Sequence, residues 1–444
     1  MVLSVLVTLV TNVFNSDLNY PWNVGSMQKF DDEAINKRFN ELVQSYSLCD
    51  QCLGRLAAKI GHGFTNKKRG EIIRRKLDIK RGIDPHHCWL CEGLVLEIDH
   101  FVSLVEEKTS EFEFETFLIG THIDEEILEK EETLQEITGS EIAETIKTDL
   151  SRNIGKKIEK NSDNIVDFHH PDIMMIIDTM FDIVHLQIKS LYVYGRYNKF
   201  QRGIPQTKWF CRSCKGKGCR NCEYTGKLFT TSVEQLIAEP LLAATGATDE
   251  SFHGSGREDI DVRMLGSGRP FVIELKNPRK RSIDYRSILL QINDENENKV
   301  GVHNLRSADK KEIAALKEGH FSKVYQVQIT GKRPFVKEKL KKVALSLRGK
   351  TIQQFTPTRV ARRRALKTRE RKIYDCNAKL IDETMAIFVI EAESGTYIKE
   401  LVTGDDGKTQ PNISDLLHDT CTVVALDVME IKGDENKWLN DQKD

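Results

Sequence analysis

Two carboxylates follow a pair of glycines in the second half of the chain. Gly254 and Gly256 precede Asp259 and Asp261, and glycine permits a tight backbone conformation that can place an acid at the lip of a sheet. Arg257 stands two residues before Asp259, where its guanidinium could steady a carboxylate or bind a substrate phosphate through two parallel hydrogen bonds. The residue types suit acid chemistry beside a phosphate, and they equally suit an ordinary solvated turn.

The residues around these acids predict a β-hairpin. We expect a strand at 261–265, a glycine-rich turn at 266–268 and a second strand at 271–275. Alternate residues of an ideal strand face the same side. Periodicity therefore does not choose between Asp259 and Asp261 as the reactive acid.

Three short motifs in this region resemble one enzyme family. Gly-Arg-Glu-Asp at 256–259, Gly-Arg-Pro-Phe at 268–271 and Glu-Leu-Lys-Asn-Pro-Arg at 274–279 are similar to motifs of Pus10, the tRNA pseudouridine synthases of archaea and eukaryotes. The resemblance extends from about residue 30 to residue 431. It implies an α+β fold, in which a mixed-sheet pseudouridine synthase catalytic domain follows a zinc-stapled, THUMP-containing RNA-binding domain.

The resemblance assigns roles to residues that lie far apart in the sequence. Asp259 matches the catalytic acid of the family, and Tyr325 matches the residue that stacks on the target base. Lys399 matches the basic partner that keeps the acid ionised, and Leu426 matches the apolar lining of the base pocket. By pattern alone, Tyr325 and Leu426 are typical of a strand core and Lys399 of an exposed helix start. Asp261 is the rival acid, and the Gly-Arg-x-Asp register selects Asp259.

The implied reaction breaks the C1′–N1 bond of uridine, rotates the uracil and joins C5 to C1′. Nothing is oxidised or hydrolysed, so one carboxylate suffices, without an organic cofactor or a catalytic metal. The sequence leaves open whether that carboxylate attacks the sugar or removes a sugar proton. A base in a folded RNA arm must be flipped out to react. The family implies action in the TΨC arm, at uridine 55 and, in archaea, also at uridine 54.

Charge is distributed unevenly along a chain whose net charge is only −1. Residues 331–372 carry sixteen Lys and Arg against two Glu, whereas residues 92–150 carry eighteen Asp and Glu against three Lys. A basic block of this density suits a polyphosphate partner, and a solvated charged face is the alternative. Ala361 replaces a His usual in the family, and 401–405 lacks its common His-Gly-Asp. The RNA-binding candidates in the block are Arg359, Arg362, Arg363 and Arg364.

Eight of the ten cysteines occur in Cys-x-x-Cys pairs, which indicates metal binding in a reducing compartment rather than a disulfide framework. We expect one or two structural Zn²⁺ sites, because four thiolates leave no open coordination position. The candidate ligands are Cys49, Cys52, Cys88 and Cys91 in one group, and Cys211, Cys214, Cys219 and Cys222 in the other. The second group is surrounded by Lys and Arg, which suits RNA. His62, His86 and His87 are spare candidates that we expect at the surface.

Three regions are expected along the chain. They are a disordered or non-native extension at 1–28, a zinc-binding THUMP-containing accessory domain at 29–230, and the catalytic domain at 231–444. The apolar stretch at 2–14 is too short to span a bilayer comfortably, and a membrane anchor is the minor alternative. Periodicity predicts helices at 31–44, 141–158, 233–244 and 307–317, and a turn into a helix at 395–401. It predicts strands at 112–120, 191–194, 321–330, 379–391 and 422–430, with a loop at 249–256.

We expect tRNA as the partner in the cytoplasm, with no membrane and no obligate protein partner. One alternative is a THUMP-type tRNA methyltransferase or thiolase. A methyltransferase should carry a glycine-rich loop between a strand and a helix, whereas Gly266-Ser267-Gly268 is expected to open no helix. The other alternative is a non-catalytic zinc-containing RNA-binding or chaperone-like protein. The second cysteine group resembles the zinc repeat of DnaJ chaperones, although only one copy is present.

Overall fold

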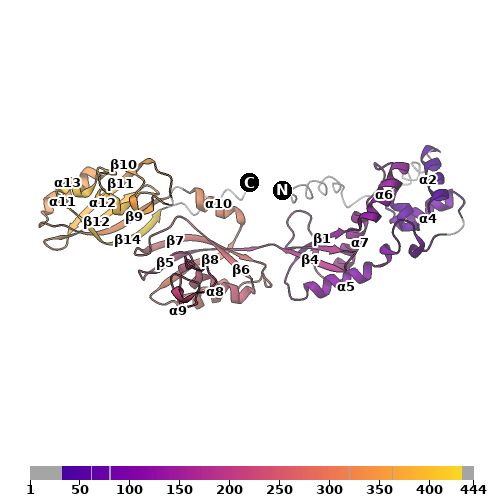
Figure 1. Ribbon diagram of the computed structural model, residues 1–444, viewed down its shortest axis with the longest axis horizontal. Coiled ribbons are helices and arrows are strands. Elements are labelled where there is room, and N and C mark those ends of the chain that lie inside the picture. Colours follow the sequence, from indigo (N-terminus) through magenta and orange to yellow (C-terminus); the bar gives the residue numbers. More distant parts are fainter. Residues whose placement is uncertain (1–32, 62, 80–81, 320, 363, 433–444) are drawn as a thin grey trace. The chain divides into compact units, whose positions relative to one another are not determined.

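Figure 1 shows a computed structural model of the chain, which describes residues 33–61, 63–79, 82–319, 321–362 and 364–432. The expected extension at 1–28, His62 and Arg363 lie outside these residues. The chain forms two compact units, Met1–Lys189 and Ser190–Asp444. Both units combine helices with a sheet, which confirms the α+β fold class.

The first unit combines helices with a four-stranded sheet. Its helices are α2 (Glu33–Ser45), α3 (Asp50–Arg55), α4 (Asn66–Lys76), α5 (Ile98–Thr109), α6 (Glu125–Thr138) and α7 (Ile146–Asn161), with 3-10 turns η2 (Pro85–His87) and η3 (Leu94–Leu96). Its strands are β1 (Thr116–His122), β2 (Ile165–Val166), β3 (Ile173–Asp178) and β4 (Ile183–Ile188). The sheet order is β2-β1-β3-β4, with β1 parallel to β2 and β3, and β4 antiparallel to β3. Helix α7 packs on β1, and α5 contacts β3 and β4.

The second unit is built on a ten-stranded sheet. Its strands are β5 (Leu191–Lys199), β6 (Asp249–Gly254), β7 (Arg263–Lys276), β8 (Val300–Ala308), β9 (Ser322–Thr330), β10 (Thr351–Phe355), β11 (Thr368–Leu380), β12 (Met385–Ala392), β13 (Thr409–Gln410) and β14 (Thr422–Lys432). Its helices are α8 (Val233–Thr245), α9 (Tyr285–Glu295), α10 (Lys310–Glu318), α11 (Lys337–Leu347), α12 (Ile398–Thr403) and α13 (Ile413–Leu417). The strand order is β13-β10-β11-β12-β9-β14-β7-β5-β8, and β6 pairs with β7 off this path. The sheet is joined in its middle by the short parallel pairing of β14 with β7.

The division between the units differs from the expected boundary at 230/231. Strand β5, which the sequence associated with the THUMP-like part, pairs with β7 and β8 of the second unit. Val193 and Tyr197 of β5 are fully buried in the core of that unit. The long connection after β5 carries the second cysteine group, so this group also belongs to the second unit.

The predicted hairpin at 261–275 is wrong, because β7 is one continuous strand from Arg263 to Lys276. Gly266 and Gly268 have φ values of +55° and +68°, but they bend the strand instead of reversing it. A Cβ on Gly266 would lie 1.8 Å from the carbonyl oxygen of Met429. The glycine therefore permits close approach of β7 to β14, which brings the two halves of the sheet together.

Other differences have local causes. The strand predicted at 379–391 spans the end of β11, a turn and most of β12, and the turn contains the polar residues Asp382, Glu383 and Thr384. The segment at 249–256, predicted as a loop, contains β6. Asp309 caps α10 and Thr145 caps α7, and both helices begin later than predicted. The strands predicted at 321–330 and 422–430 are confirmed. None of the helices in the described residues has the length and apolar composition needed to span a bilayer.

Candidate active site

The carboxylate of Asp259 lies in the loop between β6 and β7 and contacts two cations. Arg359 Nη1 donates to Oδ1 at 3.0 Å and to Oδ2 at 2.8 Å, and Nζ of Lys399 lies 3.3 Å from Oδ2. The two cations complement the charge of the carboxylate and fix its position. The Asp259 side chain remains 39% exposed, so this charge is accessible to a ligand. Asp259 and Lys399, which the sequence paired as acid and basic partner, lie together.

Lys399 contacts both candidate acids. Its Nζ donates to both carboxylate oxygens of Asp261 at 2.8 Å. Burial opposes ionisation of Asp261, but the hydrogen bond and charge of Lys399 outweigh it and hold the pKa of this carboxyl below its usual value. Asp261 is 68% exposed, and Arg359 bonds Asp259 instead. Both acids therefore contact Lys399. They differ in that Asp259 also bonds Arg359.

Arg359 links Asp259 to a second, buried carboxylate. It lies in the 3-10 turn η5 (Thr358–Val360), within the connection between β10 and β11, and its Nε donates to Oε1 of Glu400 at 2.6 Å. The Glu400 side chain is only 6% exposed. Burial disfavours the charge of Arg359, but Glu400 and then Asp259 outweigh this effect and raise its pKa. The sequence predicted Arg359 as an RNA ligand, and it did not single out Glu400; the only signal was its position next to Lys399.

The other predicted RNA and phosphate ligands have surroundings that differ from those of Arg359. Arg362 and Arg364 are exposed in the same connection, and Arg363 is not described. The guanidinium carbon of Arg257 lies 5.3 Å from the centre of the Trp209 ring. Arg257 is thus placed on an aromatic face, and Arg359 occupies the carboxylate-binding position that the sequence offered to Arg257.

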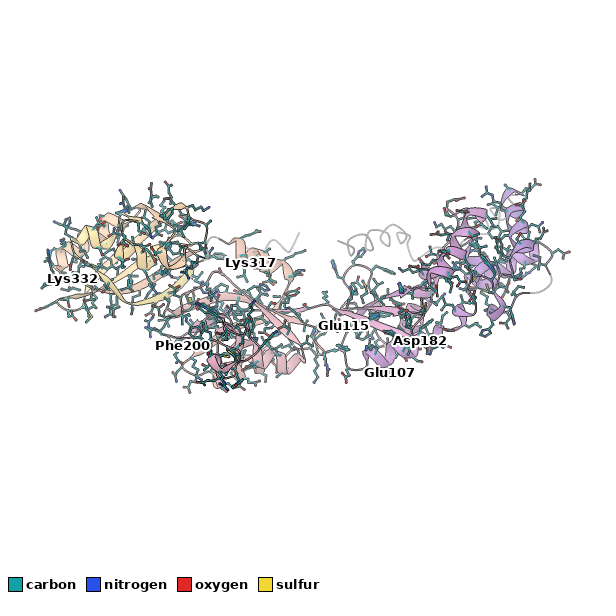
Figure 2. All side chains as sticks on the ribbon, in the orientation of Figure 1. Glu107, Glu115, Asp182, Phe200, Lys317 and Lys332 are labelled. Carbon is teal, nitrogen blue, oxygen red and sulfur yellow. The ribbon has the colours of Figure 1, made fainter. Side chains whose placement is uncertain are left out.

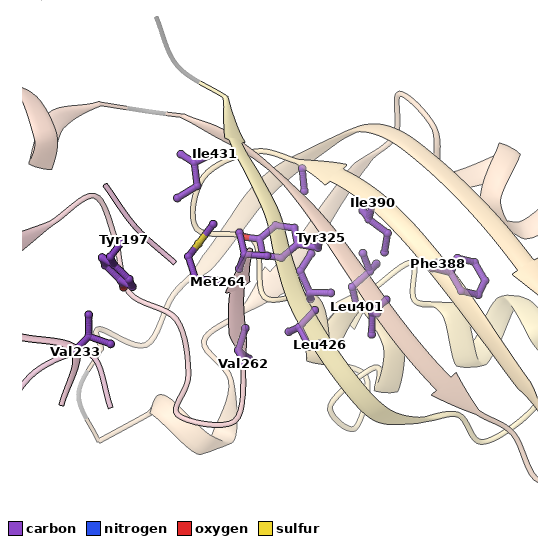
Figure 3. Packing of buried hydrophobic residues seen from close by; sticks show 14 of the residues in the cluster. Tyr197, Val233, Val262, Met264, Tyr325, Phe388, Ile390, Leu401, Leu426 and Ile431 are labelled. Carbon is purple, nitrogen blue, oxygen red and sulfur yellow. The ribbon is translucent and has the colours of Figure 1, made fainter. Parts of the chain in front are cut away.

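Tyr325 and Leu426 lie on the neighbouring antiparallel strands β9 and β14, within one apolar cluster (Figure 3). The cluster includes Val262, three residues after Asp259, and Leu401, two residues after Lys399. Chain connectivity therefore places this apolar cluster next to the Asp259–Lys399 pair. Tyr325 and Leu426 are 8% and 7% exposed, and burial raises the pKa of Tyr325 to about 12. The Tyr325 phenol therefore stays neutral near pH 7.

Arg202 connects the loop between β6 and β7, residues 255–262, to the strand that carries Leu426. We call this loop the acid loop. Its Nη1 donates to the carbonyl oxygens of Asp261 and Leu426, each at 2.8 Å, and its Nη2 donates to Oδ1 of Asp427 at 2.6 Å. Arg263 bonds the same Asp427 carboxylate. Sequence reasoning missed these residues, because their signal is a tertiary contact between segments far apart in the chain.

Several buried charged and polar residues contact one another beneath the surface and hold the acid loop in place. Glu258 accepts hydrogen bonds from the hydroxyl of Tyr197 at 2.9 and 2.8 Å, and its Oε2 lies 2.8 Å from Nε of Arg269. Lys199 Nζ donates to the carbonyl oxygen of Asp259 at 3.2 Å. Burial acts to raise the pKa of Glu258, but Arg269 and Lys199 outweigh it and lower that pKa. These contacts fix the backbone beside Asp259, and charged residues in apolar strands were their only signal in the sequence.

Lys323 provides a test of the electrostatics of this interior. Burial, with a contribution from the charge of Arg269, lowers the pKa of Lys323 to about 7. Between pH 7 and about 10 the unfolded chain then binds more protons than the folded chain, so this lysine makes stability rise with pH. We expect Lys323→Met to be more stable than the wild type at pH 7. Its advantage should shrink by up to about 1.4 kcal/mol per pH unit toward pH 10. Urea unfolding curves at several pH values measure this difference.

The exposed Lys311 of α10 offers a matched control for this comparison. Lys311→Met should run parallel to the wild type across the same pH range, because an exposed side chain is surrounded by water in both the folded and the unfolded state. Parallel curves for Lys323→Met as well would contradict a lowered pKa at Lys323.

The eight paired cysteines form two groups, each with ligand atoms within 4.8 Å of one another. In the first unit the Sγ atoms of Cys49 and Cys91 are 3.8 Å apart. In the second unit the Sγ atoms of Cys214 and Cys222 are 3.8 Å apart. A tetrahedron with Zn–S bonds of about 2.3 Å has edges of about 3.8 Å, so both groups fit a tetrathiolate metal site. His86 is exposed, as the sequence predicted.

Backbone amides are directed at these sulfurs. Cys49 N donates to Sγ of Cys88 at 3.2 Å, and Gly218 N donates to Sγ of Cys214 at 3.2 Å. Hydrogen bonds of this kind hold and orient thiolate ligands from the second coordination sphere. The two groups could therefore hold metal ions as structural ties, one in each unit.

Two family models match the chain. Residues 192–432 match the model described as "Pus10, C-terminal", and residues 101–178 match "Pus10 THUMP domain, archaeal". The class of protein that this fold and these matches define is one in which a THUMP domain precedes a mixed-sheet domain of the pseudouridine synthase type.

Curated relatives specify the family. The tRNA pseudouridine synthase Pus10 of Halorubrum lacusprofundi is 36% identical, and the alignment covers 89% of this chain and 96% of the relative. The protein of the same name from Methanothermobacter marburgensis is 39% identical, over 88% of this chain and 96% of the relative. A chain of a Cbf5-Nop10-Gar1 complex matches over 54% of this chain and 50% of its own, with 16% identity and a TM-score of 0.30. The chain belongs to the Pus10 family, as its motifs predicted.

Proposed function

We propose that the chain is a tRNA pseudouridine synthase that isomerises uridine through the carboxylate of Asp259. The observation that carries this proposal is the contact between Asp259 and Lys399. Tyr325 and Leu426 support it, because they belong to the apolar cluster that also contains Val262 and Leu401, close in sequence to that pair. The family relationship supports the same reaction. The relatives that align with this chain over 96% of their own length are named tRNA pseudouridine synthase Pus10.

The carboxylate of Asp259 acts at the ribose of the target uridine. Arg359 and Lys399 hold this carboxylate in place through their contacts with its oxygens. The C1′–N1 bond breaks, the uracil rotates, and the C5–C1′ bond forms. The proton lost from C5 is balanced by the proton gained at N1. Attack at C1′ and removal of a sugar proton both require an ionised carboxylate at the sugar.

The flipped uracil stacks on Tyr325 and lies against Leu426. These side chains are almost closed to solvent, at 8% and 7% exposure, so side chains over Tyr325 must move when the base enters. Arg359, which bonds Asp259 from the connection between β10 and β11, also has to adjust when the ribose reaches Asp259. Extrusion of a base costs a few kcal/mol of stacking and pairing, which stacking on the tyrosine offsets.

The target is the TΨC arm of tRNA, at uridine 55 and also at uridine 54. The THUMP-containing region and the basic connection between β10 and β11 grip the RNA, so that one uridine reaches Asp259. The division of roles follows the family, with an RNA-binding accessory region before the catalytic domain. The site of action is the cytoplasm, where tRNA is the partner.

Zinc is the metal that the two cysteine groups hold. Cys49, Cys52, Cys88 and Cys91 tie the first unit together, and Cys211, Cys214, Cys219 and Cys222 tie the connection after β5. A zinc ion with four thiolate ligands supplies structural cross-linking and no open position for a substrate. The isomerisation itself uses the residues around Asp259.

The test of the function is an assay on unmodified tRNA transcript without any added organic cofactor. Carbodiimide labelling followed by primer extension locates each pseudouridine in the product. We expect a stop at uridine 55, and a second stop at uridine 54. Binding of the transcript without any isomerised uridine would instead support the non-catalytic RNA-binding alternative.

The basic connection between β10 and β11 makes a separate prediction. Replacement of exposed Arg362 and Arg364 by Glu should weaken tRNA binding across all sequences. Each lost phosphate contact should also reduce the slope of log K against log salt by about 0.7–0.9. Filter binding at several salt concentrations measures both effects. The double variant Lys310→Glu with Lys311→Glu, at two exposed lysines of α10, is the charge-matched control. Unchanged affinity in the Arg362 and Arg364 double variant would exclude this connection from RNA binding.

A further inference from the structure

The second cysteine group carries large aromatic side chains on its surface. Tyr224 is 72% exposed and Phe210 is 61% exposed, and Leu228 beside them is 46% exposed. Burial of an aromatic ring is normally favourable. We call residues 210–228 the zinc knuckle. Aromatic rings left in water on so small a module mark it as an interaction surface.

The zinc knuckle is also positively charged. Its exposed cations are Arg212, Lys215, Lys217 and Arg220, and Lys227 bonds Gln235 at 2.8 Å. Glu223 is the only acidic side chain in the segment. Even the two net negative charges of a zinc tetrathiolate leave the module positive. A polyanion is therefore the complementary partner.

Close backbone contacts constrain the main chain around the rings of Phe210 and Tyr224. A Cβ on Gly216 would come within 3.0 Å of the Phe210 ring, so this glycine allows the ring to lie against the main chain. Tyr224 N donates to the carbonyl oxygen of Cys219 at 2.9 Å. Tyr224 has a φ of +60°, which is uncommon for a bulky residue. Strained conformations of this kind concentrate at functional sites, and a rigid ring loses little entropy when a ligand stacks on it.

We propose that the zinc knuckle is a binding site for unpaired nucleotides of RNA, with a base stacked on Tyr224 or Phe210 and phosphates held by the surrounding cations. Exposed aromatic rings within a basic surface are the arrangement that single-stranded nucleic acids bind, because every base has a π face. A paired duplex presents phosphates but no free base face. This inference rests on the proposed RNA substrate and names the substrate features that this module contacts.

The zinc knuckle is connected to the acid loop. Trp209 lies immediately before Phe210 in the chain, and the Arg257 guanidinium carbon is 5.3 Å from the centre of its ring. Arg257 precedes Asp259 by two residues. Phe229 packs on the same Trp209 ring, with centroids 5.5 Å apart. An RNA held by the zinc knuckle is thus bound next to Trp209, which contacts the loop that carries the catalytic carboxylate.

The experiment uses the full-length, zinc-loaded protein and measures the Kd for unmodified tRNA transcript, for a short single-stranded RNA and for a blunt duplex RNA. Tyr224→Ala should bind the transcript and the single strand about tenfold more weakly, which is equivalent to about 1.4 kcal/mol. Duplex affinity should not change. Because stacking releases no counterions, the salt slope should also be unchanged, whereas Lys215→Gln should reduce it. Tyr224→Phe should restore binding, since it keeps the ring.

Leu345→Ala, which removes an exposed apolar side chain (61%) from α11, is the matched control and should bind as the wild type does. Wild-type affinity for single strands in both Tyr224→Ala and Phe210→Ala would overturn the proposal. So would an equal loss for single-stranded and duplex RNA, or a loss of bound zinc that Tyr224→Phe shares. Normal isomerisation with unaffected binding in these variants would refute this inference alone. Weakened RNA binding in the variants, with a wild-type protein that isomerises no uridine, would refute only the proposed function.

Discussion

Asp259→Asn is expected to lose isomerisation almost completely while it binds tRNA as tightly as the wild type. Asparagine has nearly the shape of aspartate, but it lacks the charge that Arg359 and Lys399 hold in place at 2.8–3.3 Å. The rate should fall by at least about 10²-fold, the lower end of what a positioned acid or base contributes. Single-turnover conversion of tRNA transcript measures the rate, and filter binding measures the affinity.

Asp261→Asn is the matched control, because Lys399 bonds this acid as well. We expect it to keep most of the activity, since Arg359 would still hold Asp259. Near-normal turnover of Asp259→Asn, together with loss of turnover in Asp261→Asn, would transfer the catalytic role to Asp261. Loss in both variants would indicate that the two carboxylates act together through Lys399.

Cys88→Ser is expected to unfold the first unit. Cys88 is buried, and its Sγ accepts a hydrogen bond from Cys49 N at 3.2 Å. Structural zinc contributes about 10–16 kcal/mol of apparent binding free energy in zinc-finger peptides, which is as large as the whole stability of a typical domain. The variant should bind one zinc ion per chain instead of two. Protease digestion should then remove the first unit and leave the second unit intact.

Cys376→Ser tests whether any buried cysteine would have this effect. Cys376 is fully buried in β11, outside both cysteine groups, and burial raises its pKa to about 12. We expect Cys376→Ser to retain two zinc ions and to lose only the modest stability associated with a buried polar substitution. Cys88→Ser with two bound zinc ions and a protease-resistant first unit would contradict the assignment of the metal site.

The elements that position the site differ in how well local sequence describes them. Strand β9 alternates buried and half-buried residues from Ser322 to Thr330, so its period of two is visible in the sequence. Strand β7 has no such signal, because Gly266 and Gly268 resemble a turn in any local reading. Figure 2 shows that side chains cover the ribbon throughout the second unit. Which side chains meet across that unit depends on the close approach of β7 to β14 that Gly266 permits.

The sequence by itself determined the family and the cysteine groups, because short motifs carry both. The resemblance of those motifs also predicted Asp259, Lys399, Tyr325 and Leu426 as site residues. Only the tertiary structure decided that Arg359 is shared between Asp259 and Glu400. It also decided that β5 belongs to the second unit. The physical reason is that ion pairs and strand pairing depend on distance in space, and local periodicity carries no information about which distant segments become neighbours.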